Sequence, residues 1–377
     1  MMARPVLHNA FCDALGIEYP IFLAGMGVGG RATPPKLVAA VSQAGGCGVL
    51  GCSGLSPDET RRRIREVRTL TDRPFGVDLL LPARIADAPD TRSGVRDEIR
   101  RRFPEHAAFV QTLMQRYDLP AVPPADETVV NIEYAKSVLE VVFEERVPLF
   151  AAGLGDPDFL LPRARAQGMK LIGLSGSVRN AVRQRKSGVD AIVAQGTEAG
   201  GHTGTVASLP LIPQVVDAVN PTPVIAAGGI GDGRGIVAAL VLGAQAAWLG
   251  TAFLVADECE LFDACKDQIV ASDSEAFRIS KVWTGKTVRA YHSEISQAWA
   301  ESGLPTLETP YQRILMEDFL SAALAAGRHD LFYNIAGQVG GMLKARRPAS
   351  AIMADLVGGA VEEIRRLQRD VRISLAS

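Results

Sequence analysis

The sequence has few cysteines and histidines and almost no net charge. Its five cysteines are an odd number with no C-x-x-C spacing, which argues against a disulfide framework or a structural zinc site and favours a reducing cytoplasm. A formal net charge of −2 gives no general attraction for nucleic acid. The chain has no H-E-x-x-H motif, no paired histidines and no G-x-S-x-G motif, so neither a metal site nor a serine hydrolase is expected.

Long hydrophobic segments are also scarce. The N-terminal stretch "MMARPVLHNAFCDALG" has no long apolar core, so no signal peptide is expected. Residues 235–255 carry no charge and are long enough to cross a bilayer. However, Gly243 divides them into a helix-like half and a strand-like half within a series of similar units. We therefore expect no membrane partner.

Short apolar runs recur along this 377-residue chain, whose 47% hydrophobic content is typical of a globular protein. They are continuously apolar, as strands buried on both faces are. Most are separated by segments with helical spacing. Eight strands alternating with helices predict an α/β fold, a (β/α)8 TIM barrel. The runs are residues 20–24, 47–51, 75–81, 148–152, 170–174, 190–194, 223–227 and 246–250.

Two regions depart from this rhythm. Residues 82–131 are charged and proline-rich and indicate a helical insertion after strand three. Beyond residue 275 the alternation stops. The sequence thus predicts a barrel over residues 1–275, with the insertion inside it, and a helical C-terminal region over 276–377 that caps the barrel mouth.

Glycine-rich motifs follow several of the predicted strands. Residues 25–30, "GMGVGG", match the dinucleotide-binding pattern, but strand two does not end in the acid that this pattern requires to hold a ribose. "AAGGIGDGRG" and "WLGTAFL" follow strands seven and eight, where barrels often bind phosphate through backbone N–H groups. His202, in "AQGTEAGGHTG" after strand six, is expected near the same mouth, although a structural turn is the alternative.

Taken together, these motifs resemble the nitronate monooxygenase (2-nitropropane dioxygenase) family. The resemblance also covers "AVSQAGGCGVLG", "PFGVDLLL", "GKTVRAYHSEI" and "AGQVGGML", and hence nearly the whole chain. The same superfamily contains flavin-dependent enoyl-acyl-carrier-protein reductases and NAD(P)H:quinone reductases. The resemblance implies a TIM barrel that holds FMN non-covalently.

The resemblance also assigns roles to individual residues. His202 matches the catalytic histidine, which acts as a base or orients the substrate. The residues that match flavin-contacting positions, or that we expect to face the flavin from their place in the barrel, are Gly25, Met26, Asp78, Ser175, Gln195, Gly200, Gly201, Gly228, Gly229, Trp248, Leu249, Gly250 and Thr251. Two of them depart from the family pattern. Asp78 replaces the usual Asn and can donate a hydrogen bond only if it is protonated, and Trp248 replaces a frequent Gln.

Three functions remain open at this point. The first is oxidation of alkyl nitronates by O₂ to carbonyl compounds and nitrite. The second is an FMN-dependent NAD(P)H reductase of an enoyl thioester, another acyl-CoA or a quinone. The third is a flavin-binding protein without activity, against which His202 argues. Glu198 and the other four histidines are expected to be structural. The oligomeric state stays open, with a homodimer as one option.

Overall fold

Eight parallel strands close into a barrel in the computed structural model, which describes residues 6–27, 30–81, 89, 91–122 and 132–370. Each predicted apolar run forms one of these strands, so the (β/α)8 prediction is confirmed. The strands are β1 (Ile21–Leu23), β2 (Cys47–Gly51), β3 (Phe75–Leu80), β4 (Leu149–Gly153), β5 (Lys170–Ser175), β6 (Ala191–Gln195), β8 (Val224–Ala227) and β9 (Ala246–Leu249).

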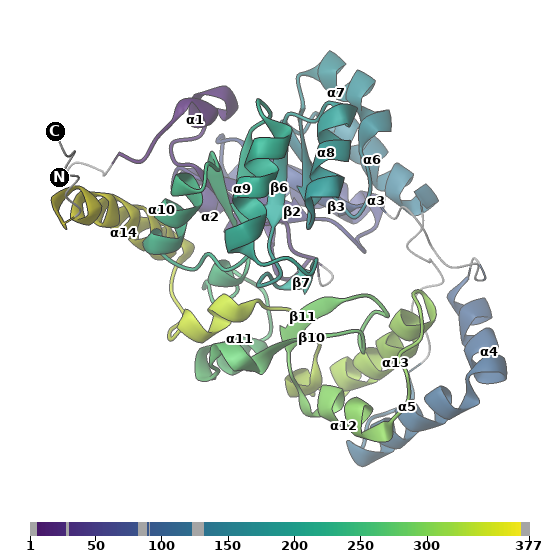
Figure 1. Cartoon of the computed structure of the whole chain (residues 1–377). Helices are drawn as coiled ribbons and strands as arrows, with labels where there is room; N and C mark the ends of the chain where they lie inside the picture. The colour runs from purple at the N-terminus through teal and green to yellow at the C-terminus, as the bar shows by residue number, and fades with distance from the viewer. Residues whose placement is uncertain (1–5, 28–29, 82–88, 90, 123–131, 371–377) are drawn as a thin grey trace.

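Helices cover the outside of the barrel (Figure 1). In α3, Ser56 caps the first turn by accepting a hydrogen bond from the Glu59 N–H, and Ile64 and Val67 face inward. The outer helices are α2 (Pro35–Gln43), α3 (Pro57–Leu70), α6 (Ile132–Glu144), α7 (Leu161–Gln167), α8 (Val178–Ser187), α9 (Ser208–Val219) and α10 (Gly233–Val241), with the short α1 (Ala10–Leu15) before β1.

The strands are buried on both faces, which explains their continuous apolar sequence. Alternate side chains pack outward under the helices, as Val77 does, or inward to fill the barrel, as Phe22 and Val193 do. Two polar side chains on the inner face, Asp78 of β3 and Gln195 of β6, lie in the half of the strand toward the mouth.

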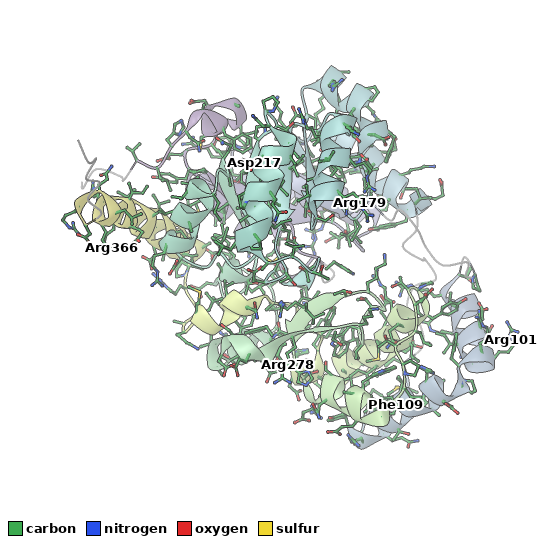
Figure 2. All side chains as sticks on the ribbon, in the orientation of Figure 1. Arg101, Phe109, Arg179, Asp217, Arg278 and Arg366 are labelled. Atoms are coloured by element: carbon green, nitrogen blue, oxygen red, sulfur yellow. The ribbon has the colours of Figure 1, made fainter. Side chains whose placement is uncertain are left out.

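A second hydrophobic core lies beyond the mouth, in a region that we call the cap. It consists of α4 (Arg92–Arg102) and α5 (Pro104–Arg116) from the predicted insertion, and α12 (Glu294–Ser302) and α13 (Tyr311–Ala325) from the C-terminal region. The turn of residues 281–287 also belongs to the cap, because its Val282 and Trp283 pack into the same core. Exposed arginines such as Arg101 cover its outer surface (Figure 2). Residues 82–88, 90 and 123–131 of the insertion lie outside the described residues.

The C-terminal region was predicted to be helical, but it also contains strands. A hairpin of β10 (Phe277–Ser280) and β11 (Val288–Tyr291) pairs with β7 (Gly201–His202) to form a three-stranded antiparallel sheet between barrel and cap (Figure 1). The sequence signal was weak because these strands are short and carry arginines. Their partner strand, β7, also lies far away in the sequence.

The last helix returns to the outside of the barrel. α14 (Ala349–Asp370) packs against α10 and α2, and Ile352, Met353 and Leu356 join the outer core of the barrel. A Cβ added at Gly233 would overlap the backbone of Gly359 and Ala360, so the glycine permits this close helix contact. The predicted cap over 276–377 thus includes a helix that belongs to the barrel wall. In the chain, α11 (Asp263–Ala271) lies between β9 and β10.

The uncharged stretch 235–255 is divided as the sequence predicted. It forms most of α10, then β9 and a 3₁₀ turn, η2 (Thr251–Phe253). Among the described residues, no helix is both long and apolar enough to cross a membrane. All five cysteines are buried free thiols.

Candidate active site

His202 lies between the barrel mouth and the cap. It belongs to β7 in the loop after β6, where it pairs with Val288 of β11. Gln195, at the end of β6, donates a hydrogen bond from Nε2 to the His202 carbonyl at 2.7 Å. A backbone hydrogen bond from Thr197 to Val206 at 2.8 Å closes the same loop. The His202 backbone is therefore bonded both to the end of the barrel strand β6 and to the hairpin strand β11.

The glycines beside His202 bring the loop close to a C-terminal segment. A Cβ at Gly200 would lie 2.7 Å from the Ala336 carbonyl carbon and the Gly337 nitrogen, and Gly201 has a left-handed φ of +80°. The Gln338 N–H donates to the Glu198 carbonyl at 3.0 Å. These contacts give both glycines a role within the fold, and their contact with the flavin stays a prediction.

Arg289 is a site residue that the sequence analysis missed. Its Nε and Nη2 donate to the Thr197 carbonyl at 3.0 and 2.9 Å, and its Nη1 donates to the Phe277 carbonyl at 2.6 Å. The side chain is only 7% exposed, and burial lowers its pKa despite the nearby Glu198. It fixes the β6 loop to the hairpin. The available signal was a charged residue inside the apolar alternation "VRAY".

Glu198 has a structural role, as expected. Its carboxylate oxygens each lie 3.0 Å from the Ser208 N–H, which starts α9, and one lies 2.9 Å from the Ser208 hydroxyl. That hydroxyl also lies 2.9 Å from the Gly228 carbonyl. Glu198 thereby joins the loop after β6 to the loop after β8.

His202 is neutral at pH 7 in this environment. Its pKa is lowered to about 4, mainly by burial and also by the nearby positive charges of Lys286 and Arg313. A neutral imidazole has one donor and one acceptor nitrogen. It can therefore hydrogen-bond an anionic substrate, but it is a weak base.

Asp78 is the second unusual titratable group at the mouth. It faces the barrel interior from β3, where a Cβ on Gly25 would overlap its side chain. It is 6% exposed, and burial raises the pKa of its carboxyl group to about 8. At pH 7 the carboxyl is mostly protonated and can donate a hydrogen bond, as the Asn usual in the family would.

The loops after β8 and β9 expose backbone donors side by side. Gly228 and Gly229 have φ of +91° and +72°, and the pairing of Ala227 with Trp248 brings Gly229 level with Gly250. Within the described residues, the N–H groups of Gly229, Gly250 and Thr251 have no hydrogen-bond partner. Unpaired backbone donors at adjacent strand ends fit a phosphate group.

Two other residues of the predicted phosphate site have side chains that point elsewhere. Trp248 stacks on Phe22 inside the barrel, with ring centroids 5.5 Å apart, and Leu249 packs under the outer helices. Only their backbone lies near the site. In contrast, Met26 lies at the mouth, with Sδ 3.1 Å from where a Cβ on Gly250 would be. Thr33 fixes the Met26 backbone through hydrogen bonds to both its N–H and its carbonyl.

The prediction that Ser175 faces the flavin is wrong for its side chain. Ser175 points outward from β5, and its hydroxyl donates to Oε1 of Gln184 in α8 at 2.6 Å. Its strand partner Ala194 also belongs to the outer core. Alternation along the strand decides the direction, and Leu174, not Ser175, faces inward.

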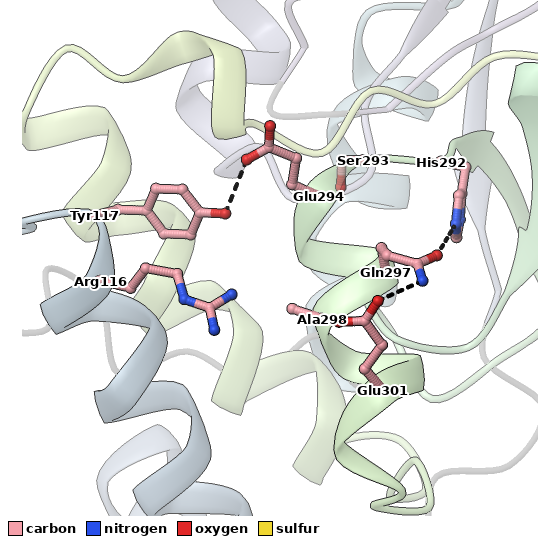
Figure 3. Close-up of a pocket in the computed structure, with 8 residues that line it drawn as sticks. All are labelled: Arg116, Tyr117, His292, Ser293, Glu294, Gln297, Ala298 and Glu301. Carbon is pink, nitrogen blue, oxygen red and sulfur yellow. Dashed lines mark hydrogen bonds between the residues drawn. The ribbon is translucent and has the colours of Figure 1, made fainter.

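The other four histidines have structural surroundings. His8 pairs with Asp13 on the surface, His106 bonds the Pro305 carbonyl, and His329 stacks on Phe262. His292 bonds Gln297 Oε1 at 3.1 Å inside a groove of about 400 Å³ between α5 and α12 (Figure 3). The residues lining that groove come from the end of α5, from the segment after β11 and from α12. No cluster of three potential metal ligands occurs in the described part of the chain.

The chain is similar to proteins of one family along nearly its whole length. A family model described as nitronate monooxygenase matches residues 8–359. A Mycobacterium tuberculosis protein whose name includes monooxygenase is 37% identical over 379 residues, which cover 96% of this chain and 99% of that protein. The "Probable nitronate monooxygenase" of Staphylococcus aureus is 32% identical over 360 residues, with 93% and 96% covered.

Solved structures agree with this similarity. Nitroalkane oxidase from Streptomyces ansochromogenes has a TM-score of 0.81 at 28% identity and covers 95% of this chain and 100% of that one. FabK from Thermotoga maritima has a TM-score of 0.75 at 29% identity, with 97% and 100% covered. The family implies a flavin cofactor, and the unpaired donors described above fit its phosphate. The chain therefore belongs to the nitronate monooxygenase family and is an oxidoreductase.

Proposed function

We propose that the protein oxidises alkyl nitronates with O₂ to carbonyl compounds and nitrite, with FMN as its cofactor. The observation that carries the proposal is the neutral, partly buried His202 at the mouth. A base with a pKa of about 4 takes a proton from a neutral carbon acid poorly at pH 7. A nitronate has already lost that proton and needs only a hydrogen bond at its nitro oxygens.

The glycine loops would hold the FMN phosphate through the N–H groups of Gly229, Gly250 and Thr251. Met26 and Gln195 would border the flavin at the mouth, and FMN when bound supplies the electron acceptor. The protonated Asp78 would donate a hydrogen bond from the barrel interior. His202 would orient the substrate, and the cap would shield it from water.

The test compares preformed nitronate with the neutral nitroalkane in the wild type and His202→Asn. We expect FMN to stay bound, because its phosphate donors lie on other loops. We expect kcat/KM to fall by about 10²- to 10³-fold for both substrates, the usual effect of losing one oriented donor. His292→Asn, in the groove of the cap, is the matched control and should leave kcat/KM unchanged.

Three outcomes would change this proposal. A loss on the nitroalkane much larger than on the nitronate would make His202 the base. No loss on either substrate would make it structural. Release of FAD rather than FMN on heat denaturation would contradict the cofactor assignment.

The NAD(P)H reductase is the second candidate, because FabK is as similar in sequence as the nitroalkane oxidase is. Anaerobic stopped-flow mixing separates the two candidates. NAD(P)H should bleach the flavin rapidly only in a reductase, whereas a nitronate should do so in the proposed enzyme. We place the enzyme in a reducing cytoplasm, which its five buried free thiols support.

A further inference from the structure

We propose that Lys286 and Arg313 of the cap form an anion-binding side of the substrate site, next to His202, which selects anionic over neutral substrates. This inference rests on the proposed function and deepens it, because it names the residues that determine its substrate class. It assigns that selection to the cap and not to the barrel.

The turn that carries Lys286 is fixed against the start of α13. Gly285 has a φ of +76°, and a Cβ on it would lie 2.7 Å from the Thr309 nitrogen. The Thr309 hydroxyl donates to the Thr284 carbonyl, and Gln312 Nε2 donates to the Val282 carbonyl at 2.6 Å. The turn therefore lies beside the first turn of α13, which contains Arg313.

The strand pairing directs His202 toward the cap. Val288 lies opposite His202 in the antiparallel pair, and side chains of directly opposed residues share a face. Val288 packs into the core of the cap, whereas Arg289 turns the other way, to Thr197. Lys286 lies in the turn two residues before Val288, and its charge and that of Arg313 both act on His202.

Lys286 is a half-buried cation that has no ion pair among the described residues, and its pKa is lowered by burial and by Arg313. Arg313 Nε bonds Glu317 Oε1 at 2.7 Å, and Arg92 contacts the other oxygen of the same carboxylate at 2.8 Å, so Glu317 does not pair with Arg313 alone. Within the described part of the chain, no acidic group is among the charges that act on His202.

Buried donors without partners lie in the same region. The Tyr333 hydroxyl and the Trp283 indole N–H are buried and unbonded among the described residues. The two rings stack with centroids 5.1 Å apart, and Arg313 acts electrostatically on Tyr333. Unsatisfied donors beside the ammonium group of Lys286 favour a ligand with anionic oxygens.

Nitrate is the probe, because it is a planar monoanion whose oxygen atoms resemble those of a nitro group. Nitrate binding to the oxidised holoenzyme would be titrated through the flavin absorbance spectrum. We expect Lys286→Gln and Arg313→Gln each to weaken nitrate binding at least tenfold, and Arg313→Lys to retain most of it. Lys281→Gln, at an exposed position on the same hairpin, is the matched control and should bind nitrate like the wild type.

Unchanged nitrate affinity in Lys286→Gln, or an equal loss in Lys281→Gln, would overturn the proposal. If Arg313→Gln fails to fold because Glu317 loses a partner, Lys286→Gln alone decides the outcome. The test is independent of turnover. A holoenzyme that binds nitrate through Lys286 but does not oxidise nitronates would keep the anion site and reject the proposed function.

Discussion

The barrel mouth and the cap contribute different kinds of polar group to the same site. The mouth offers backbone N–H groups at Gly229 and Gly250 and a protonated carboxyl at Asp78. The cap offers full charges at Lys286 and Arg313. His202 lies between them and is neutral. In the functions proposed above, the barrel binds the cofactor through uncharged donors and the cap selects the substrate by charge.

The largest effect is expected at the connection between the two regions. Arg289→Met would leave the Thr197 and Phe277 carbonyls buried without their donor. We expect the free energy of unfolding to fall by about 3 kcal/mol or more, because each unsatisfied buried group costs about 1–3 kcal/mol. Urea unfolding of the holoenzyme measures the loss.

Arg278→Met is the control for this experiment, because Arg278 is exposed on the neighbouring strand β10 (Figure 2). It should lower the free energy of unfolding by less than about 0.5 kcal/mol. Equal losses in the two variants would mean that Arg289 does not connect the β6 loop to the hairpin.

Asp78 gives the next largest effect, as a dependence of stability on pH. Its pKa is raised to about 8 by burial, so between pH 4 and 8 the unfolded chain releases this proton while the folded chain keeps it. Its contribution therefore makes the protein less stable as pH rises, by about 1.4 kcal/mol per pH unit. Asp78→Asn should remove this slope in urea unfolding at pH 5, 6 and 7.

Asp72→Asn, at an exposed position before β3, should keep the wild-type slope. If Asp78→Asn keeps it as well, the Asp78 carboxyl is ionised in the folded protein and the mouth is not uncharged. The contrast between an uncharged barrel mouth and a charged cap would then not hold.

A smaller effect is expected at the glycine loops. Gly228→Ala introduces a side chain at φ +91°, with its Cβ 2.9 Å from the Gly196 carbonyl oxygen. Backbone strain of this kind costs about 1–3 kcal/mol, and the displaced loop should weaken FMN binding at least tenfold. Flavin fluorescence on dilution measures the affinity.

Gly303→Ala in the cap provides the matched control. Gly303 has a φ of +70°, and nothing lies within 4 Å of an added Cβ. It should lose stability from strain alone and keep its FMN affinity. Equal loss of FMN in both variants would assign the effect to stability and not to the phosphate loops.

The smallest effect is expected for Tyr333→Phe. Its hydroxyl is buried without a partner in the described structure, so its removal should change the free energy of unfolding by less than about 1 kcal/mol. Nitrate binding should weaken about threefold if the hydroxyl donates to the anion. A clear loss of stability would instead show that the hydroxyl has a structural partner.

Much of the barrel could be predicted from local sequence. A strand buried on both faces must be apolar at every position, and the eight runs from residue 20 to residue 250 satisfied this condition. Gly228 and Gly229 were also recognisable, because a sharp turn with positive φ favours glycine. His202 was found through its glycine-rich motif and the family resemblance.

The tertiary structure decided what each of these residues contacts. Ser175 is turned to Gln184 by the register of β5, Asp78 is protonated because the barrel buries it, and His202 is paired with a strand whose first residue, Val288, lies 86 positions along the chain. Local sequence determines whether a segment is buried, because hydrophobicity and periodicity are local properties. Protonation, charge compensation and hydrogen-bond partners depend on groups that only folding brings together, which is why Arg289 and the charged side of the cap emerged from the structure alone.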